Sequence, residues 1–185
     1  MTDRMVKGSH LIQAKELLDA RLGSGTYERL MTEERGQVSP LLPGTWYEVA
    51  PLVRTLRRAG RDLHLDLESL TAEVARRNAF SDLPSIYRVF LRIAQPRRLL
   101  MFVPQLWRTY VDFGEGRVIE NEVGRFIGQC DGIPEDLQEW GCGCWLGFLP
   151  AAVELCGGKT KRAKVLRSWR DGSGYHSFQL EIVYT

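Results

Sequence analysis

Apolar positions in the first half of the chain recur at the spacing of an α-helix. Residues 9–22 and 66–80 each place leucine, valine, isoleucine or alanine on one side of such a helix. Residues 97–108 are apolar almost all round, which is typical of a buried helix, and Pro104 predicts a kink within it. We therefore expect a helical segment over about 9–108.

Two further helix starts are expected inside this segment. Thr45 and Glu48 have the capping-box spacing, so they predict a helix that runs to Gly60. Ser81 predicts a new helix start after the helix of residues 66–80, because proline is tolerated in a first helical turn and Pro84 follows.

The hydrophobic period changes to two after the helical segment. Residues 110–130 predict two or three short strands, 134–156 a long helix, and 161–185 a hairpin. The predicted fold class is α+β, with an antiparallel sheet of about four to five strands packed against a helical N-terminal half and one long C-terminal helix. We expect a single domain over 1–185, helical over about 9–108, with the sheet and long helix over about 109–185.

Composition and charge exclude several classes of protein. The 185 residues carry a net charge of only +2, and the basic residues are spread along the chain, so we expect no nucleic-acid partner. No run of about 18 apolar residues is present, so no membrane span is expected. The N-terminus lacks the apolar segment of a secretory signal, and the four cysteines are interpreted as thiols, which together predict a cytoplasmic protein.

Three of the cysteines lie in the stretch WGCGCWLGFLPAAVELCGGK, residues 140–159. The Cys142–Cys144 spacing is narrower than that of structural zinc sites, and about 18 Å of helix would separate Cys144 from Cys156. No histidine and carboxylate pattern points to an activated thiol. We expect no metal site and no catalytic residue here, and interpret the stretch as a small-residue helix that packs closely against its neighbours.

A resemblance adds to this interpretation. The segments FLRIAQPRRLLMFVPQLWRTYVDF and CWLGFLPAAVELCGGK, with Pro96–Arg98, Arg108–Thr109 and Gly157–Gly158, resemble a family of uncharacterised myxobacterial domains. That family is similar to the haem-nitric-oxide-binding domains, the 4-vinyl-reductase domains and the Bet3-type TRAPP subunits. The resemblance implies a sheet backed by helices with a cavity between them. In the relatives this cavity holds haem or an aromatic molecule, takes an acyl chain, or is closed in a dimerising scaffold.

The residues that the relatives use for haem are missing from the expected places. The histidines are His10, His64 and His176, and none lies on the helices predicted to be buried at 84–108 and 145–156. The resemblance implies a Tyr-x-Ser-x-Arg clamp, but the similar YHSFQ at 175–179 has Gln179 in place of the arginine.

The zinc site of the aromatic-sensor relatives is also incomplete. Glu154 and Cys156 match it, but Ala163 and Val165 stand where the later cysteine is expected. We therefore expect neither haem nor zinc, and no other cofactor.

The remaining feature is a set of large apolar side chains on the helices that we expect to face the sheet. The predicted ligand-binding residues are Phe90, Phe102, Leu106, Trp107, Trp145 and Phe148. No nucleotide-binding or hydrolase motif is present, so we expect a non-enzymatic sensor or regulatory module. Its helix–sheet pocket would take an apolar small molecule or lipid, and a protein partner and a homodimer are expected. The alternative is a ligand-free dimerising protein-interaction scaffold, in which the same side chains are plain core.

Overall fold

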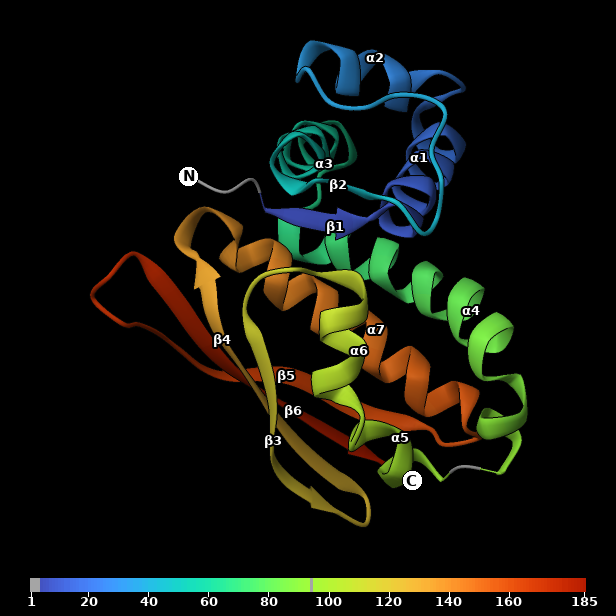
Figure 1. Cartoon of the computed structure of the whole chain (residues 1–185), viewed down its shortest axis with the longest axis vertical. Helices are drawn as coiled ribbons and strands as arrows, with labels where there is room; N and C mark the ends of the chain where they lie inside the picture. The colour runs from blue at the N-terminus through green and yellow to red at the C-terminus, as the bar shows by residue number, and fades with distance from the viewer. Residues whose placement is uncertain (1–3, 94) are drawn as a thin grey trace.

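The structure, a computed structural model, describes residues 4–93 and 95–185, apart from the side chains of residues 85–93. The helices are α1 (Gly8–Leu22), α2 (Thr26–Glu33), α3 (Val49–Leu63), α4 (Leu67–Ile93), α5 (Pro96–Leu100), α6 (Val103–Tyr110) and α7 (Gln138–Leu155), with a 3-10 turn at Glu135–Leu137. The strands are β1 (Met5–Lys7), β2 (Trp46–Glu48), β3 (Glu115–Glu122), β4 (Arg125–Pro134), β5 (Thr160–Arg170) and β6 (Tyr175–Tyr184). Figure 1 shows α1, α2 and α3 gathered at one end of the molecule and the large sheet at the other.

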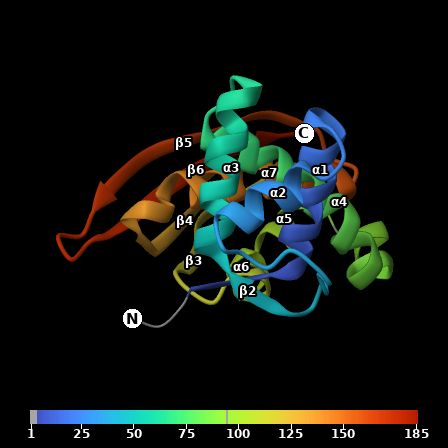
Figure 2. The same ribbon diagram turned by 90° about the horizontal axis from the view of Figure 1, so that it is seen from above.

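The large sheet is antiparallel with the order β3-β4-β6-β5. Phe178, Leu180 and Ile182 alternate along β6 and are fully buried, as expected for side chains on the core face of a sheet. The long helix α7 packs against this sheet, and the β5–β6 hairpin projects past the helices (Figure 2). The predicted α+β class, with its antiparallel sheet and long C-terminal helix, is confirmed.

A small second sheet ties the N-terminus to the rest of the fold. Strand β1 pairs with β2 through Val6 and Tyr47, and Val6 also bridges to Val111, directly after α6. The predicted helix start at Thr45 is therefore wrong, because Trp46–Glu48 pair as a strand and α3 begins only at Val49.

Two other predicted helix boundaries also differ. Helix α4 runs through Ser81 without a break, because its packing along α7 overrides a weak local start signal. The apolar stretch 97–108 forms two helices, α5 and α6, instead of one kinked helix. Pro104 lies in the first turn of α6, where its missing N–H costs no helical hydrogen bond.

Helices α4 and α7 touch backbone to backbone. A Cβ atom added at Gly147 would lie 1.9 Å from the carbonyl oxygen of Ala72, and one at Gly143 would lie 2.5 Å from that of Glu68. Neither position has room for any side chain, so the two glycines set the distance between the helices. Among the described residues, none of the helices is both long and apolar enough to cross a bilayer.

We predict that Gly147→Ala destabilises the protein strongly. The added methyl group meets a backbone oxygen that cannot turn aside, so we expect a loss of about 3 kcal/mol, the upper end of the usual range for overpacking, or a failure to fold. Urea unfolding measures the loss. Gly44→Ala is the matched control, because a Cβ there meets no atom within 4 Å, and we expect a change below about 0.5 kcal/mol. Equal losses in both variants would contradict the close contact.

Candidate functional site

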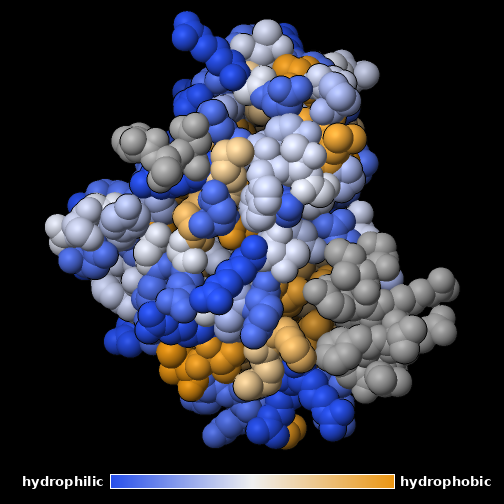
Figure 3. All heavy atoms as spheres, viewed as in Figure 1, coloured by the Kyte–Doolittle hydropathy of each residue, from blue (hydrophilic) through white to orange (hydrophobic). Residues whose placement is uncertain are grey.

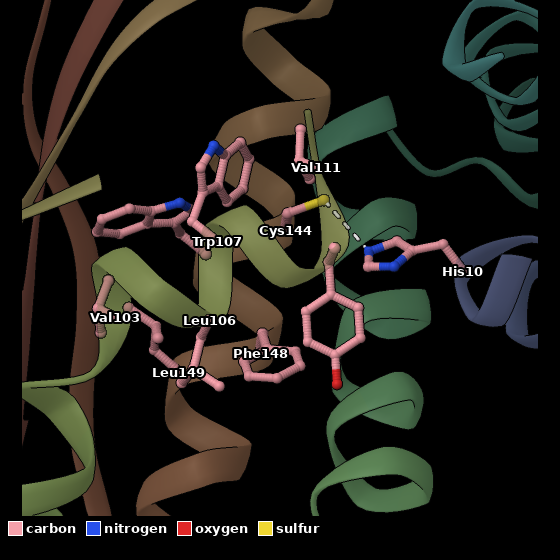
Figure 4. A pocket seen from close by; sticks show the side chains of 10 residues that line it. His10, Val103, Leu106, Trp107, Val111, Cys144, Phe148 and Leu149 are labelled. Carbon is pink, nitrogen blue, oxygen red and sulfur yellow. Dashed lines mark hydrogen bonds between the residues drawn. The ribbon is translucent and has the colours of Figure 1, made fainter. Parts of the chain in front are cut away.

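A small apolar cavity lies where α6 and α7 face the start of α1 (Figure 4). Its volume is about 30 Å³. The residues that line it are His10, Val103, Leu106, Trp107, Tyr110, Val111, Cys144, Trp145, Phe148 and Leu149.

Helical spacing places these side chains together. On α6, Val103, Leu106, Trp107 and Tyr110 follow the three- and four-residue steps of one helix face. On α7, the lining residues fall into two neighbouring pairs four positions apart, which again share one face. The cavity thus lies between an apolar face of α6 and an apolar face of α7, which the fold places opposite each other.

Four of the six predicted ligand-binding residues line this cavity: Leu106, Trp107, Trp145 and Phe148. Phe102 does not, because it is the residue before α6 and its side chain is 47% exposed. The side chain of Phe90 lies outside the described residues.

The cavity lies between helices, whereas the predicted pocket lay between helix and sheet. Trp145 explains the difference. Its indole ring packs directly against two glycines of the sheet. A Cβ atom at Gly128 would be 2.5 Å from the ring, and one at Gly116 would be 3.2 Å from it. The ring also meets Phe178 edge-on, with 5.6 Å between the ring centroids. Trp145 therefore fills the space over the sheet, and the open volume is left on the α6 side.

His10 is a polar group at this site that was not among the predicted site residues. It is 3% exposed, and its two ring nitrogens face different neighbours. Nδ1 lies 3.3 Å from Nδ2 of Asn78 on α4, and Nε2 lies 3.7 Å from Sγ of Cys144, as the dashed line in Figure 4 shows. One signal could have found it, because His10 shares a helical face with the core residues Ala14 and Leu17.

Burial keeps both groups of this pair uncharged. Desolvation lowers the pKa of His10 to about 4. Desolvation likewise raises the pKa of the Cys144 thiol well above its ordinary value. At neutral pH the cavity therefore presents a neutral imidazole and a protonated thiol.

The other candidate chemistries find no support in the described part of the chain. Burial raises the pKa of Cys142 to about 12, and raises those of Cys130 and Cys156 as well, so none of these thiols is activated as a nucleophile. No group of three or more histidine, cysteine, aspartate or glutamate side chains within the described residues is arranged to hold a metal ion. Glu154 instead forms an ion pair with Arg76.

The fold is closely similar to several solved structures. No protein-family model matches the sequence, and no curated protein matches it. An oxygen-binding H-NOX domain related to soluble guanylate cyclases superposes with a TM-score of 0.71 at 8% identity, over 97% of this chain and 95% of that one. An H-NOX structure solved to probe haem distortion in that family gives 0.74 at 10%, over 97% and 95%. An unliganded Fe(II) H-NOX variant from K. algicida gives 0.71 at 11%, over 95% and 96%. This chain has the H-NOX fold.

The H-NOX fold raises the question of haem, and the cavity does not fit it. A volume of about 30 Å³ is far too small for a tetrapyrrole ring, and Trp107, Trp145 and Phe148 occupy the surrounding space. Haem iron also needs an axial ligand such as histidine, cysteine or tyrosine. His10 and Cys144 contact each other, and the hydroxyl of Tyr110 interacts with the carboxyl group of Asp82.

The histidines outside the cavity do not supply that ligand either. His64 is exposed at the end of α3, and His176 on β6 accepts a hydrogen bond from Arg170. Gln179, at the place of the clamp arginine, hydrogen-bonds Gln129 and Arg167.

We predict that His10 makes stability depend on pH. Its folded pKa of about 4 lies below the ordinary value of 6.5, so the unfolded chain binds more protons between these values. The stability from neutral His10 is therefore complete above about pH 7 and falls as the pH drops to about 4, by about 3 kcal/mol in total. Urea unfolding across this range should show a smaller loss for His10→Gln than for the wild type. The control His64→Gln, at an exposed position, should behave as the wild type does, and an unchanged pH profile in His10→Gln would contradict the prediction.

Proposed function

We propose that this protein is a non-enzymatic sensor or regulatory module that binds a small apolar molecule without haem. The observation that carries the proposal is the preformed cavity, with apolar and aromatic walls and few polar groups, which is the usual form of a small-molecule site. The neutral state of His10 and the unactivated thiol of Cys144 support binding over catalysis.

The cavity volume supports the smallest members of the predicted ligand class. A water molecule needs about 10–15 Å³ when volume is measured with a water-sized sphere. The cavity of about 30 Å³ therefore takes a molecule of two or three non-hydrogen atoms as it stands. A lipid chain would need the helices to move apart, so the proposal is a small molecule in preference to a lipid.

The position of the cavity supports a sensing role. Its walls come from α1, α6 and α7 and from Val111, the residue directly after α6. Val111 also bridges to Val6 of β1. Since β1 leads directly into α1, a ligand that displaces Val111 would act on the N-terminal helices. A protein partner that contacts these helices would then respond to whether a ligand is bound. The resemblance to the 4-vinyl-reductase and Bet3-type domains is part of the same proposal.

We predict that xenon enters the cavity. Xenon is a suitable probe because it binds in small apolar cavities without needing a hydrogen bond. Under xenon pressure, the methyl signals of Val103, Leu106, Val111 and Leu149 should shift in NMR spectra, while methyl signals far from the cavity stay in place. Val103→Ile should weaken the shifts severalfold, because its extra methyl group occupies the cavity. Val183→Ile, which adds the same group on the outer part of β6, should not.

Two results would overturn this function. One is the absence of any localised xenon shift in the wild type. The other is uptake of haem at one equivalent with a strong Soret band, which would show that a much larger group fits.

The alternative, a dimerising scaffold without a ligand, is favoured by an exposed apolar surface. Met101, between α5 and α6, is 53% exposed, and Ile119 on β3 is 51% exposed, while α5 and α6 both pack against β3. Figure 3 shows apolar atoms gathered over this part of the molecule. Exposed apolar surface of this kind often marks a protein contact.

We predict that, if this scaffold is the function, a double variant Met101→Lys with Ile119→Lys weakens a homodimer at least about tenfold. Charged side chains in a dimer contact lose hydration, so they should dissociate it. Sedimentation over a concentration series measures the effect. Leu42→Lys is the control, since Leu42 is 56% exposed in a different part of the chain. A wild type that stays monomeric at every concentration would exclude the dimer.

A further inference from the structure

His10 is a buried polar group among the residues that line the cavity, and its neighbours determine what kind of ligand the cavity prefers. His10 comes from α1, Asn78 from α4 and Cys144 from α7. His10 and Asn78 are buried to 3% and 0% exposure, so neither group can satisfy its hydrogen bonds with bulk water. The hydrogen bonds of these two side chains can therefore be made only inside the protein or with a ligand.

Asn78 sets the tautomer of His10. The amide nitrogen Nδ2 of Asn78 faces Nδ1 of His10 at 3.3 Å, and an amide nitrogen can only donate. With the amide in this orientation Nδ1 accepts, which assigns the ring proton of the neutral imidazole to Nε2. His10 thus directs an N–H donor toward Cys144 at the edge of the cavity (Figure 4).

That donor has a poor partner. A thiol sulfur is a weak acceptor, and the Nε2–Sγ distance is 3.7 Å. A buried N–H group with a weak partner gains free energy when a better acceptor arrives. The remaining walls of the cavity, apart from the hydroxyl end of Tyr110, are hydrocarbon or aromatic, and a charged ligand would lose its hydration without gaining an ion pair there.

The geometry points to a ligand that is small, uncharged and mostly apolar, and that carries one hydrogen-bond acceptor for His10 Nε2–H. This inference rests on the proposed function, since it names the class of molecule that the same cavity takes. His10 is the residue that confers the preference, and Asn78 acts through it as a positioning residue.

Acetonitrile and propyne test the inference as a matched pair. Both are linear molecules of three non-hydrogen atoms, and they differ mainly in that acetonitrile ends in an acceptor nitrogen and propyne in a C–H group. The measured quantity is the ratio of their dissociation constants, from the methyl shifts of the cavity residues. Because hydration of the two probes is the same in every experiment, it cancels when ratios are compared between variants.

We expect the double variant His10→Leu with Asn78→Leu to reduce the preference for acetonitrile by about threefold to tenfold, the value of one hydrogen bond. Changing both partners avoids leaving the Asn78 amide buried and unpaired. Cys144→Ala should raise the preference, because it removes the competing sulfur. The control Val183→Ile should leave the ratio unchanged, since Val183 does not line the cavity.

A second measurement does not depend on any variant. A long-range proton–nitrogen NMR spectrum of the wild type shows which ring nitrogen of His10 carries the proton, and we expect Nε2. A proton on Nδ1, or equal probe ratios in the wild type and the double variant, would overturn the inference and leave the apolar cavity in place. Failure of propyne, acetonitrile and xenon alike to bind would instead overturn the proposed function.

Discussion

The direct backbone contact between α4 and α7 is the constraint on which the rest of the structure depends. With Gly143 and Gly147 against carbonyl oxygens of α4, α7 has no freedom to rotate or to move closer. Its opposite side lies on the sheet. The face of α7 that meets α6 carries Cys144, Trp145 and Phe148. Gly143 and Gly147 therefore fix the position of the helix whose residues form one wall of the cavity.

The same constraint explains why the open volume is small and lies away from the sheet. Because α7 cannot withdraw, the ring of Trp145 needs a place on the sheet, and the glycines of β3 and β4 provide it. Close packing then extends through Trp107, whose ring lies 6.1 Å from that of Trp145 between centroids, and on to Trp140. Large rings in this layer leave room for a few atoms, whereas a haem would require several of them to be replaced at once.

Hydrophobic period and glycine position were sufficient to predict the fold class, the final hairpin, the close-packed helix, which was expected at 134–156 and runs over 138–155, and four of the cavity residues. What the sequence could not provide were effects that depend on distant partners. Residues 46–48 form a strand only because Met5–Lys7 lie beside them, and the start signal at Ser81 is overridden by packing on α7. Burial of His10 likewise depends on α4 and α7, which are far away in the chain.

The buried His10–Asn78 pair is difficult to explain by stability alone. Burial depresses the pKa of His10, so the group costs stability at low pH, and replacing two buried polar partners with apolar groups of similar shape is often nearly neutral. By this comparison, a plain core with leucine at both positions would be about as stable. The pair gives the cavity something that leucine cannot, a donor of fixed direction in apolar surroundings. Such a group adds little to folding, but it discriminates between ligands of the same shape, because an N–H with only a weak acceptor in a dry site favours a molecule that can accept from it better.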